Sequence, residues 1–178
     1  MALDKLSVLI TAEQIQNRIR ELAAKIDADY SNPNESVFLI CILKGAYVFM
    51  ADLSRAIKRP VIVDFMGISS YGKGKTSSGE VRVTKDLDTV IEGHHVIIVE
   101  DIVDSGVTLT YLLNLLDQRK PRSIKIAALL DKPERRLRPV TAAYAGFSIP
   151  DEFVVGYGLD YAEKYRSLPD ICILSESE

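Results

Sequence analysis

The stretch that decides the fold is VIIVEDIVDSGVTLTYL, residues 96–112. An apolar run rich in β-branched residues ends in Glu100 and Asp101, and a short polar segment containing glycine leads from Asp104 into a leucine-rich pattern. The apolar run predicts a strand that is covered on both faces, and the leucines predict a helix after it. Three acids at the end of a buried strand indicate a ligand that carries positive charge or many hydroxyls.

The rest of the chain repeats this alternation of strand and helix. Amphipathic patterns predict helices over 11–26 and 45–57 and a third that ends at Pro121, and Thr11 with Gln14 forms a capping box at the start of the first. Apolar or alternating runs predict strands over 36–43, 61–68, 80–86, 95–101, 123–131, 153–158 and 171–175. We therefore expect one α/β domain over residues 1–178, with a mainly parallel, twisted sheet flanked by helices.

Composition narrows the class of protein. The 178 residues are 47% apolar and 26% charged, with a net charge of −3, which argues against a partner nucleic acid held by bulk electrostatics. No apolar run is long enough to span a membrane, and the N-terminus lacks the pattern of a signal peptide. Cys41 and Cys172 lie in separate apolar runs, which is typical of reduced core residues. These features predict a cytoplasmic protein without a membrane partner.

Several charged positions follow the predicted strands directly. In open parallel sheets, ligands bind outside the carboxyl ends of the strands. Lys44–Gly45, Glu100–Asp101, Asp131–Lys132 and Asp160 should therefore converge.

The acid-rich stretch has the chemistry of a sugar-phosphate site. Backbone amides of the segment 104–108, at the start of a helix, can hold a phosphate, and Ser105 and Thr108 add hydroxyls. Glu100 and Asp101 can accept hydrogen bonds from ribose hydroxyls and attract Mg²⁺. The plain alternative is a strand-to-helix turn in which Asp104 or Ser105 caps the helix. The dense clustering of acids favours a ribose-5-phosphate site.

A glycine-rich segment imitates a different phosphate-binding motif. YGKGKTSS, residues 71–78, resembles a P-loop, but Ser69 stands where that motif needs glycine, and a strand-like run follows instead of a helix. The segment 69–79 is better interpreted as a flexible lid.

Longer segments carry a family resemblance. VIIVEDIVDSGVTL (96–109) resembles the phosphoribosyl-pyrophosphate (PRPP) motif of type I phosphoribosyltransferases. CILKGAYVFMADL (41–53), DFMGISSYG (64–72) and GFSIPDEFVVGYGLDYAEKYRSLPDICILSE (146–176) are similar to the hypoxanthine-guanine branch of that family. The resemblance spans about 36–175 and implies the family fold, with a small hood formed by the chain ends and a lid loop.

The resemblance also implies a reaction and a set of roles. The reaction is purine salvage, in which the 5-phosphoribosyl group passes from PRPP to hypoxanthine or guanine with Mg²⁺. Lys44 and Gly45 match the pyrophosphate loop, in which the peptide bond before the lysine, here Leu43–Lys44, is often cis. Ser70 and Tyr71 match the lid. Glu100 and Asp101 match the acids for ribose and magnesium, and Asp104 matches the base that takes the N7 proton of the purine. The 5′-phosphate loop corresponds to Asp104, Ser105, Gly106, Val107 and Thr108, where some relatives have lysine in place of Val107.

The purine-binding roles fall near the C-terminus. Lys132 matches the lysine that donates to the exocyclic oxygen of a 6-oxopurine, so adenine should be rejected. Phe153 matches the ring that stacks on the base, and Val154 supplies backbone groups to its edge. Asp160, beside the purine, matches a further metal-binding acid. Arg166 faces pyrophosphate, with Arg136 as a supporting basic residue.

Other functions remain open on the sequence alone. A xanthine-preferring transferase and an RNA-binding regulator share this fold, although the acidic charge and the purine-type C-terminal segment disfavour the regulator. A phosphoacceptor signalling domain also ends a strand in aspartate, but it needs an acidic pair on its first strand, and LSVLIT (6–11) has none. The resemblance implies a homodimer or a homotetramer.

Overall fold

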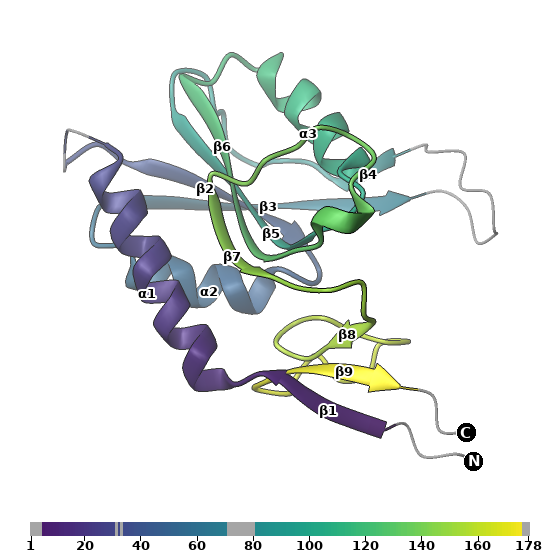
Figure 1. Cartoon of the computed structure of the whole chain (residues 1–178). Coiled ribbons are helices and arrows are strands. Elements are labelled where there is room, and N and C mark those ends of the chain that lie inside the picture. The colour runs from purple at the N-terminus through teal and green to yellow at the C-terminus, as the bar shows by residue number, and fades with distance from the viewer. Residues whose placement is uncertain (1–4, 31, 33, 71–80, 176–178) are drawn as a thin grey trace.

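The computed structural model describes residues 5–30, 32, 34–70 and 81–175 (Figure 1). The helices are α1 (Ala12–Ala28), α2 (Tyr47–Ala56) and α3 (Val107–Asp117), with one 3₁₀ turn, η1 (Pro133–Arg135). The strands are β1 (Lys5–Ile10), β2 (Val37–Leu43), β3 (Val61–Ser70), β4 (Val81–Lys85), β5 (His95–Val103), β6 (Ser123–Asp131), β7 (Tyr144–Ser148), β8 (Val154–Val155) and β9 (Ile171–Ser175).

The main sheet has the order β4-β3-β2-β5-β6-β7. All neighbouring pairs are parallel except β3 and β4, which pair antiparallel at the edge. The parallel registers place Val103 beside Asp131 and Asp131 beside Ser148, so the carboxyl ends of β5, β6 and β7 lie next to one another. The predicted mainly parallel sheet is confirmed.

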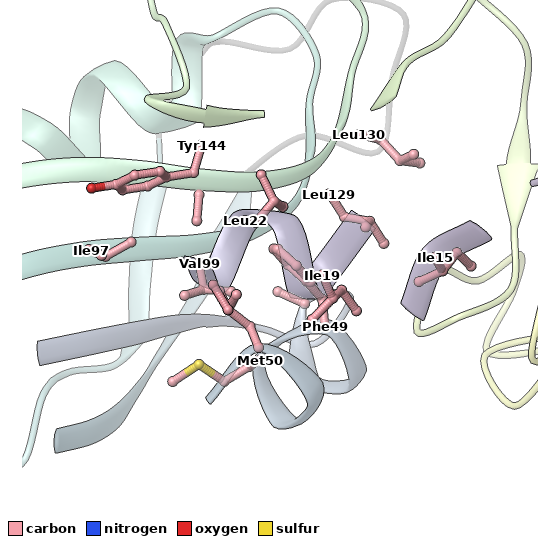
Figure 2. Packing of buried hydrophobic residues seen from close by; sticks show 14 of the residues in the cluster. Ile15, Ile19, Leu22, Phe49, Met50, Ile97, Val99, Leu129, Leu130 and Tyr144 are labelled. Atoms are coloured by element: carbon pink, nitrogen blue, oxygen red, sulfur yellow. The ribbon is translucent and has the colours of Figure 1, made fainter. Parts of the chain in front are cut away.

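Alternate residues of the buried strands pack against helices on opposite faces. Leu39 and Cys41 of β2 belong to the core cluster under α1 and α2, whereas Phe38 and Ile40 belong to the cluster under α3. Figure 2 shows the first cluster, in which side chains of α1 and α2 meet those of β5 and β6. Burial on both faces explains the continuous apolar runs of these strands. The capping box predicted at the start of α1 is also present.

A small second sheet forms the hood. β9 lies between β1 and β8, and both of its neighbours run antiparallel to it. The two ends of the described chain therefore lie side by side, as Figure 1 shows. The hood that the family resemblance implied is confirmed. The strands of the structure differ from the predicted strands at three places. β1 and β7 were not predicted, and β8 covers only two residues of the predicted strand 153–158.

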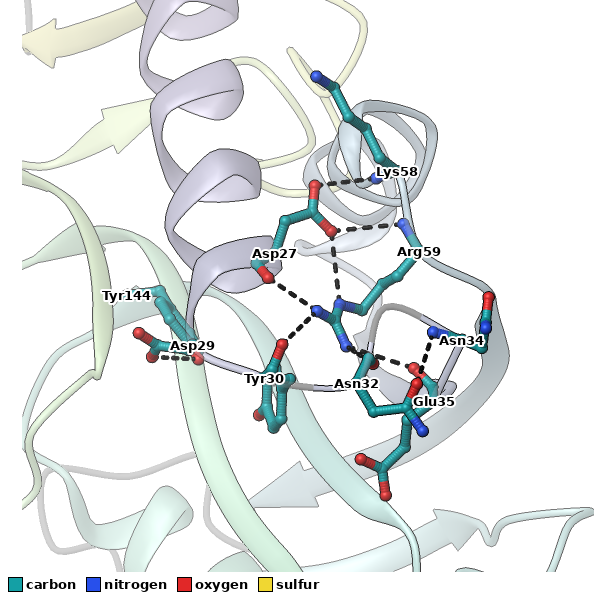
Figure 3. Close-up of polar contacts among 9 residues, drawn as sticks. All are labelled: Asp27, Asp29, Tyr30, Asn32, Asn34, Glu35, Lys58, Arg59 and Tyr144. Atoms are coloured by element: carbon teal, nitrogen blue, oxygen red, sulfur yellow. Dashed lines mark hydrogen bonds and ion pairs between the residues drawn. The ribbon is translucent and has the colours of Figure 1, made fainter.

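A buried arginine holds the connection between α1 and β2 (Figure 3). The side chain of Arg59 is 3% exposed, and it donates to four main-chain carbonyls, at 2.7–3.3 Å, of Asp27, Tyr30, Asn32 and Glu35. Its guanidinium also pairs with the Asp27 carboxylate at 3.4 Å. These bonds tie carbonyls from the end of α1 and from the connection to a single buried side chain. Within the described ranges, no helix combines the length and apolar composition needed to cross a membrane.

Candidate active site

A polar cleft of about 320 Å³ opens at the carboxyl ends of β2 and β5. Its walls come from the loop after β2, the end of β5, the first turn of α3 and the segment after β8. Of the residues predicted for the site, it is lined by Lys44, Gly45, Glu100, Asp101, Thr108, Asp160 and Arg166. The predicted convergence is therefore confirmed for three of the four strand-end positions.

Close backbone packing brings the loop after β2 against Asp101. A Cβ atom on Gly45 would lie 1.5 Å from Asp101 Oδ2, so no larger residue fits beside this carboxylate. Gly158 lies on the other side of the same loop, where its own Cβ would approach the Gly45 carbonyl oxygen to 2.2 Å. Its φ of +101° is also a conformation that glycine adopts readily. The Leu43–Lys44 peptide bond is cis, as the family resemblance implied.

The two acids at the end of β5 share an environment that opposes ionisation. Burial and the neighbouring Asp101 carboxylate raise the pKa of Glu100 well above its ordinary value. Burial raises the pKa of Asp101 to about 6, although the Ile102 amide and Arg166 act in the opposite direction. Ile102 N donates to Asp101 Oδ1 at 2.7 Å. Two adjacent carboxyls that resist ionisation form a strong binding site for a cation or for several hydroxyl donors.

A second hollow of about 100 Å³ adjoins the first at the N-terminus of α3. It is lined by Glu100, Ile102, Asp104, Ser105, Gly106, Thr108 and Leu109. Gly106 precedes the helix in a left-handed conformation, with φ of +80°, and no side chain caps the helix there. Neither Asp104 nor Ser105 is the N-cap residue of α3, although Ser105 Oγ accepts a hydrogen bond from the Val107 amide at 3.4 Å. The amides of the first turn beyond Val107 have no side-chain cap and are suited to an anion.

The Asp104 carboxylate stands at the rim of this hollow. Arg135 Nε lies 2.9 Å from Asp104 Oδ1, and Arg136 Nη1 donates to the Asp104 carbonyl at 3.0 Å. Arg136 also pairs with Asp131, so the basic segment after β6 braces the turn after β5. This explains the placement of Arg136 as a supporting residue.

The segment after β8 brings one acid and one base to the cleft and adds a further acid. Arg166 Nη2 lies 2.8 Å from Asp160 Oδ1, and Arg166 Nη1 donates to the Gly158 carbonyl at 2.8 Å. Glu163 was not predicted as a site residue. Its carboxylate contacts Lys44 Nζ at 3.1 Å and Arg166 Nη2 at 3.5 Å. A surface glutamate gives no sequence signal that would separate it from a solvated charge.

Three predicted purine-binding residues lie in the segment that links β6 to β8 or at its ends. Lys132 is 7% exposed, and its Nζ donates to the Glu152 carbonyl at 2.6 Å, so it is not a solvated surface lysine. Phe153 is 52% exposed and meets Tyr161 edge-to-face with ring centroids 5.7 Å apart, so it is not a core aromatic. Val154 is buried in the hood.

Two predictions fall at the edge of the structure. Ser70 ends β3 opposite Val81, and Tyr71 lies outside the described residues, as does most of the predicted lid and the segment that imitates a P-loop. Over the described ranges, no three His, Cys, Asp or Glu side chains gather into a metal-binding group. Any divalent cation at Glu100 and Asp101 would therefore complete its coordination with substrate oxygens and water.

Comparison with known proteins agrees with this geometry. Residues 10–162 match the model of the phosphoribosyl transferase domain family. A hypoxanthine-guanine phosphoribosyltransferase of Bacillus subtilis is 52% identical over 167 residues, which cover 94% of this chain and 92% of that protein. The crystal structure of such an enzyme from Bacillus anthracis matches with a TM-score of 0.91 at 48% identity, over 97% of this chain and 100% of the other.

A third relative bears on assembly. The structure of a Trypanosoma cruzi hypoxanthine phosphoribosyl transferase, studied for how its C-terminal region affects oligomeric state and activity, matches with a TM-score of 0.90 at 47% identity. The alignment covers 95% of this chain and 91% of that one. With this fold, this cleft and these relatives, the chain belongs to the hypoxanthine-guanine phosphoribosyltransferases of the phosphoribosyl transferase domain family.

Proposed function

We propose that the protein transfers the 5-phosphoribosyl group from PRPP to hypoxanthine and guanine, which yields the nucleoside 5′-monophosphate and pyrophosphate. The observation that carries the proposal is the junction of two hollows at the end of β5. Glu100 and Thr108 line both of them, so a carboxylate-lined cleft and the start of α3, where glycine is the N-cap residue, share one wall. A sugar with a 5′-phosphate has hydroxyls for the first hollow and an anion for the second.

The ribose and phosphate contacts follow from this arrangement. Glu100 and Asp101 accept hydrogen bonds from the ribose hydroxyls, and the amides of 105–108 hold the 5′-phosphate. Because backbone amides supply these bonds, Val107 does not prevent phosphate binding. Lys44 and Arg166, which line the larger cleft, face the pyrophosphate group.

The nucleophile is a nitrogen atom of the purine, and a side chain of the protein removes the purine's N7 proton. Asp104 takes the N7 proton as N9 bonds to C1′ of the ribose, a type of general base catalysis typically worth about 10²–10⁴ in rate. The Arg135 contact to Asp104 opens when the base enters. Lys132 donates to the 6-oxo group, Phe153 stacks on the ring and Val154 supplies main-chain groups. An adenine amino group would place donors against the Lys132 ammonium, which disfavours it.

Magnesium fits the donor set of the cleft. Two adjacent carboxyls whose pKa values are raised lose their protons more readily beside a divalent cation, and oxygen ligands are those that Mg²⁺ prefers. Glu100 and Asp101 are the residues that would hold it, together with oxygens of PRPP and water, while Asp160, also considered as a ligand, lines the same cleft and pairs with Arg166 at 2.8 Å. When bound, the cation neutralises charge that grows on the departing pyrophosphate.

We further infer a single domain that associates with a second copy of itself. One main sheet runs from β4 to β7 and one hood packs beside it, without a linker between them in the described ranges. Val63 and Phe65 of β3, which are 41% and 38% exposed, point to the same face of the sheet. Apolar side chains on a strand surface are suited to an interface between copies.

We also infer a cytoplasmic location, because two free, buried cysteines fit a reducing compartment.

One turnover experiment tests the proposal. The protein is mixed with PRPP, Mg²⁺ and, in turn, hypoxanthine, guanine, xanthine and adenine, and nucleotide formation is followed. The proposal predicts turnover with hypoxanthine and guanine and none with adenine. Preference for xanthine would move the protein to a neighbouring branch, and absence of turnover with all four bases would reject the proposal.

A further inference from the structure

A hydrogen bond remote from the reacting atoms joins helix α2 to the segment that follows β8. Tyr157 Oη donates to Asp52 Oδ2 at 2.5 Å. Tyr157 begins the segment 157–166, which supplies Asp160 and Arg166 to the cleft, and Asp52 lies on α2, which directly follows the Lys44–Gly45 loop. We propose that Tyr157 is a positioning residue, whose hydroxyl fixes this segment on α2 in the arrangement that binds PRPP. The inference rests on the proposed function for the identity of the substrate.

The backbone at Tyr157 needs such an anchor. Gly156, Tyr157 and Gly158 have φ values of +97°, +51° and +101°, so three successive residues adopt left-handed conformations. Such a conformation is unfavourable for tyrosine, and it persists only where the surroundings enforce it. The Tyr157 amide donates to the Leu168 carbonyl at 2.8 Å, and its side chain is 6% exposed. The ring and hydroxyl therefore provide the contacts that hold this backbone in place.

The surroundings of Asp52 make its carboxylate a strong acceptor for the Tyr157 hydroxyl. The side chain of Asp52 is 14% exposed, and Gln16 Nε2 on α1 donates to the same oxygen, Oδ2, at 2.6 Å. Burial alone would raise the pKa of Asp52, but hydrogen bonds from Tyr157, Gln16 and Arg55 outweigh it and lower that pKa. Burial and the bond to Asp52 raise the pKa of Tyr157 far above its ordinary value. The pair is thus a neutral donor and a charged acceptor, which makes a strong hydrogen bond.

The anchor reaches the cleft through tight packing. Gly158, the next residue, lies against the Gly45 carbonyl, and Gly45 lies against Asp101 Oδ2. The Gly158 amide donates to the Arg166 carbonyl at 2.9 Å, and its own carbonyl accepts from Arg166 Nη1 at 2.8 Å. A shift at Tyr157 therefore moves Gly158, and with it the guanidinium of Arg166.

The test compares Tyr157→Phe with a matched control. Tyr157→Phe keeps the ring and removes the hydroxyl, and Gln16→Met removes the other donor to the same oxygen while the Tyr157 bond remains. Hydrogen bonds to charged groups are strong enough to change an equilibrium by about tenfold or more. We expect Tyr157→Phe to raise KM for PRPP roughly tenfold with kcat within about twofold, because bound PRPP restores the arrangement at saturation. Gln16→Met should leave both constants near the wild-type values.

A second pair of measurements separates positioning from general stability. Hydrogen exchange without substrate should be faster in Tyr157→Phe at the Gly158, Tyr161 and Lys164 amides, which bond within the segment, and unchanged in Gln16→Met. Asp52→Asn keeps an acceptor for Tyr157 and should therefore raise KM for PRPP less than Asp52→Leu does. Because Asp52→Leu and Tyr157→Phe remove the same bond, the double variant should have a KM for PRPP no higher than that of the more affected single variant.

Wild-type KM and wild-type exchange in Tyr157→Phe would overturn the inference, as would an equal rise of KM in Gln16→Met. The exchange comparison needs no substrate. It therefore still decides the inference about the anchor if the wild-type protein makes no nucleotide, an outcome that would reject the proposed function instead.

Discussion

Replacement of Asp101 by asparagine should stabilise the protein at neutral pH while it removes PRPP binding. The folded-state pKa of Asp101 is about 6, against 3.8 for an aspartate in water. A difference of about two pKa units corresponds to a free energy on the order of 3 kcal/mol against the ionised form. Asparagine has nearly the same shape, and its Oδ1 can still accept from the Ile102 amide.

The pH dependence follows from the direction of this shift. Because the folded protein holds the Asp101 proton more tightly than the unfolded chain does, the free energy of unfolding falls as pH rises from about 4 to about 6. The cost of ionisation is complete above that window and absent below it. The stabilisation by Asp101→Asn should therefore be on the order of 3 kcal/mol at pH 7.5 and about half of that at pH 5. For a domain of this size, a stabilisation of about 3 kcal/mol corresponds to a rise in Tm of roughly 6–12 °C.

Thermal unfolding of both proteins, without Mg²⁺ and at the two pH values, measures this directly. The control is Asp86→Asn, because a hydrogen bond from Arg119 lowers the pKa of Asp86, and its loss should slightly destabilise the protein at pH 7.5. A Tm for Asp101→Asn equal to or below that of the wild type at pH 7.5 would refute the reasoning. An equal gain at both pH values would show that packing, and not charge, is responsible.

Three further substitutions probe the proposed roles. Asp104→Asn should lower kcat by about 100-fold or more, with much less effect on PRPP affinity, because backbone amides hold the phosphate. Steady-state kinetics and a PRPP binding titration measure the two effects separately. An unchanged kcat would rule out Asp104 as the base. Lys132→Met should raise KM for hypoxanthine by roughly tenfold or more without admitting adenine, as steady-state kinetics with both bases will test; unchanged KM would mean that Lys132 only braces the Glu152 carbonyl. Glu163→Gln should lower KM for PRPP slightly, because it frees Lys44 from a weak, exposed ion pair; a higher KM would mean that Glu163 itself assists binding.

The strand and helix around the acid-rich stretch could be predicted because local and global signals agree there. β5 and β6 are buried on both faces, which requires continuous apolar runs, and α3 packs one leucine face on the sheet. Because ligands of parallel sheets bind at the carboxyl ends of the strands, the position of the cleft could also be predicted from the sequence.

The elements that were not predicted depend on distant partners. β1 is an edge strand of the hood, and most of its side chains are exposed. It is held by pairing with β9, from the other end of the chain. β8 is shorter than its apolar run because the left-handed residues 156–158 turn the chain away from the sheet. The pairing of β1 with β9 has no local sequence signal, whereas Gly156 and Gly158 are a local signal for the end of β8.

Parts of the site were hidden for the same reason. The contact of Gly158 with the Gly45 carbonyl and the bond from Tyr157 to Asp52 join positions more than 100 residues apart in sequence, as the separation of 105 for the latter bond shows. The partner of Lys132 is the Glu152 carbonyl, just before β8, and the partner of Asp104 is Arg135 in η1, so neither contact could be read from the spacing of the motif residues.

The most direct test of the central claim is a crystal structure with the product inosine 5′-monophosphate. Our account predicts that the phosphate oxygens lie within hydrogen-bond distance of the amides of 105–108 and that the ribose hydroxyls face Glu100 and Asp101. A nucleotide whose phosphate lies elsewhere, or whose ribose turns away from both carboxylates, would contradict it.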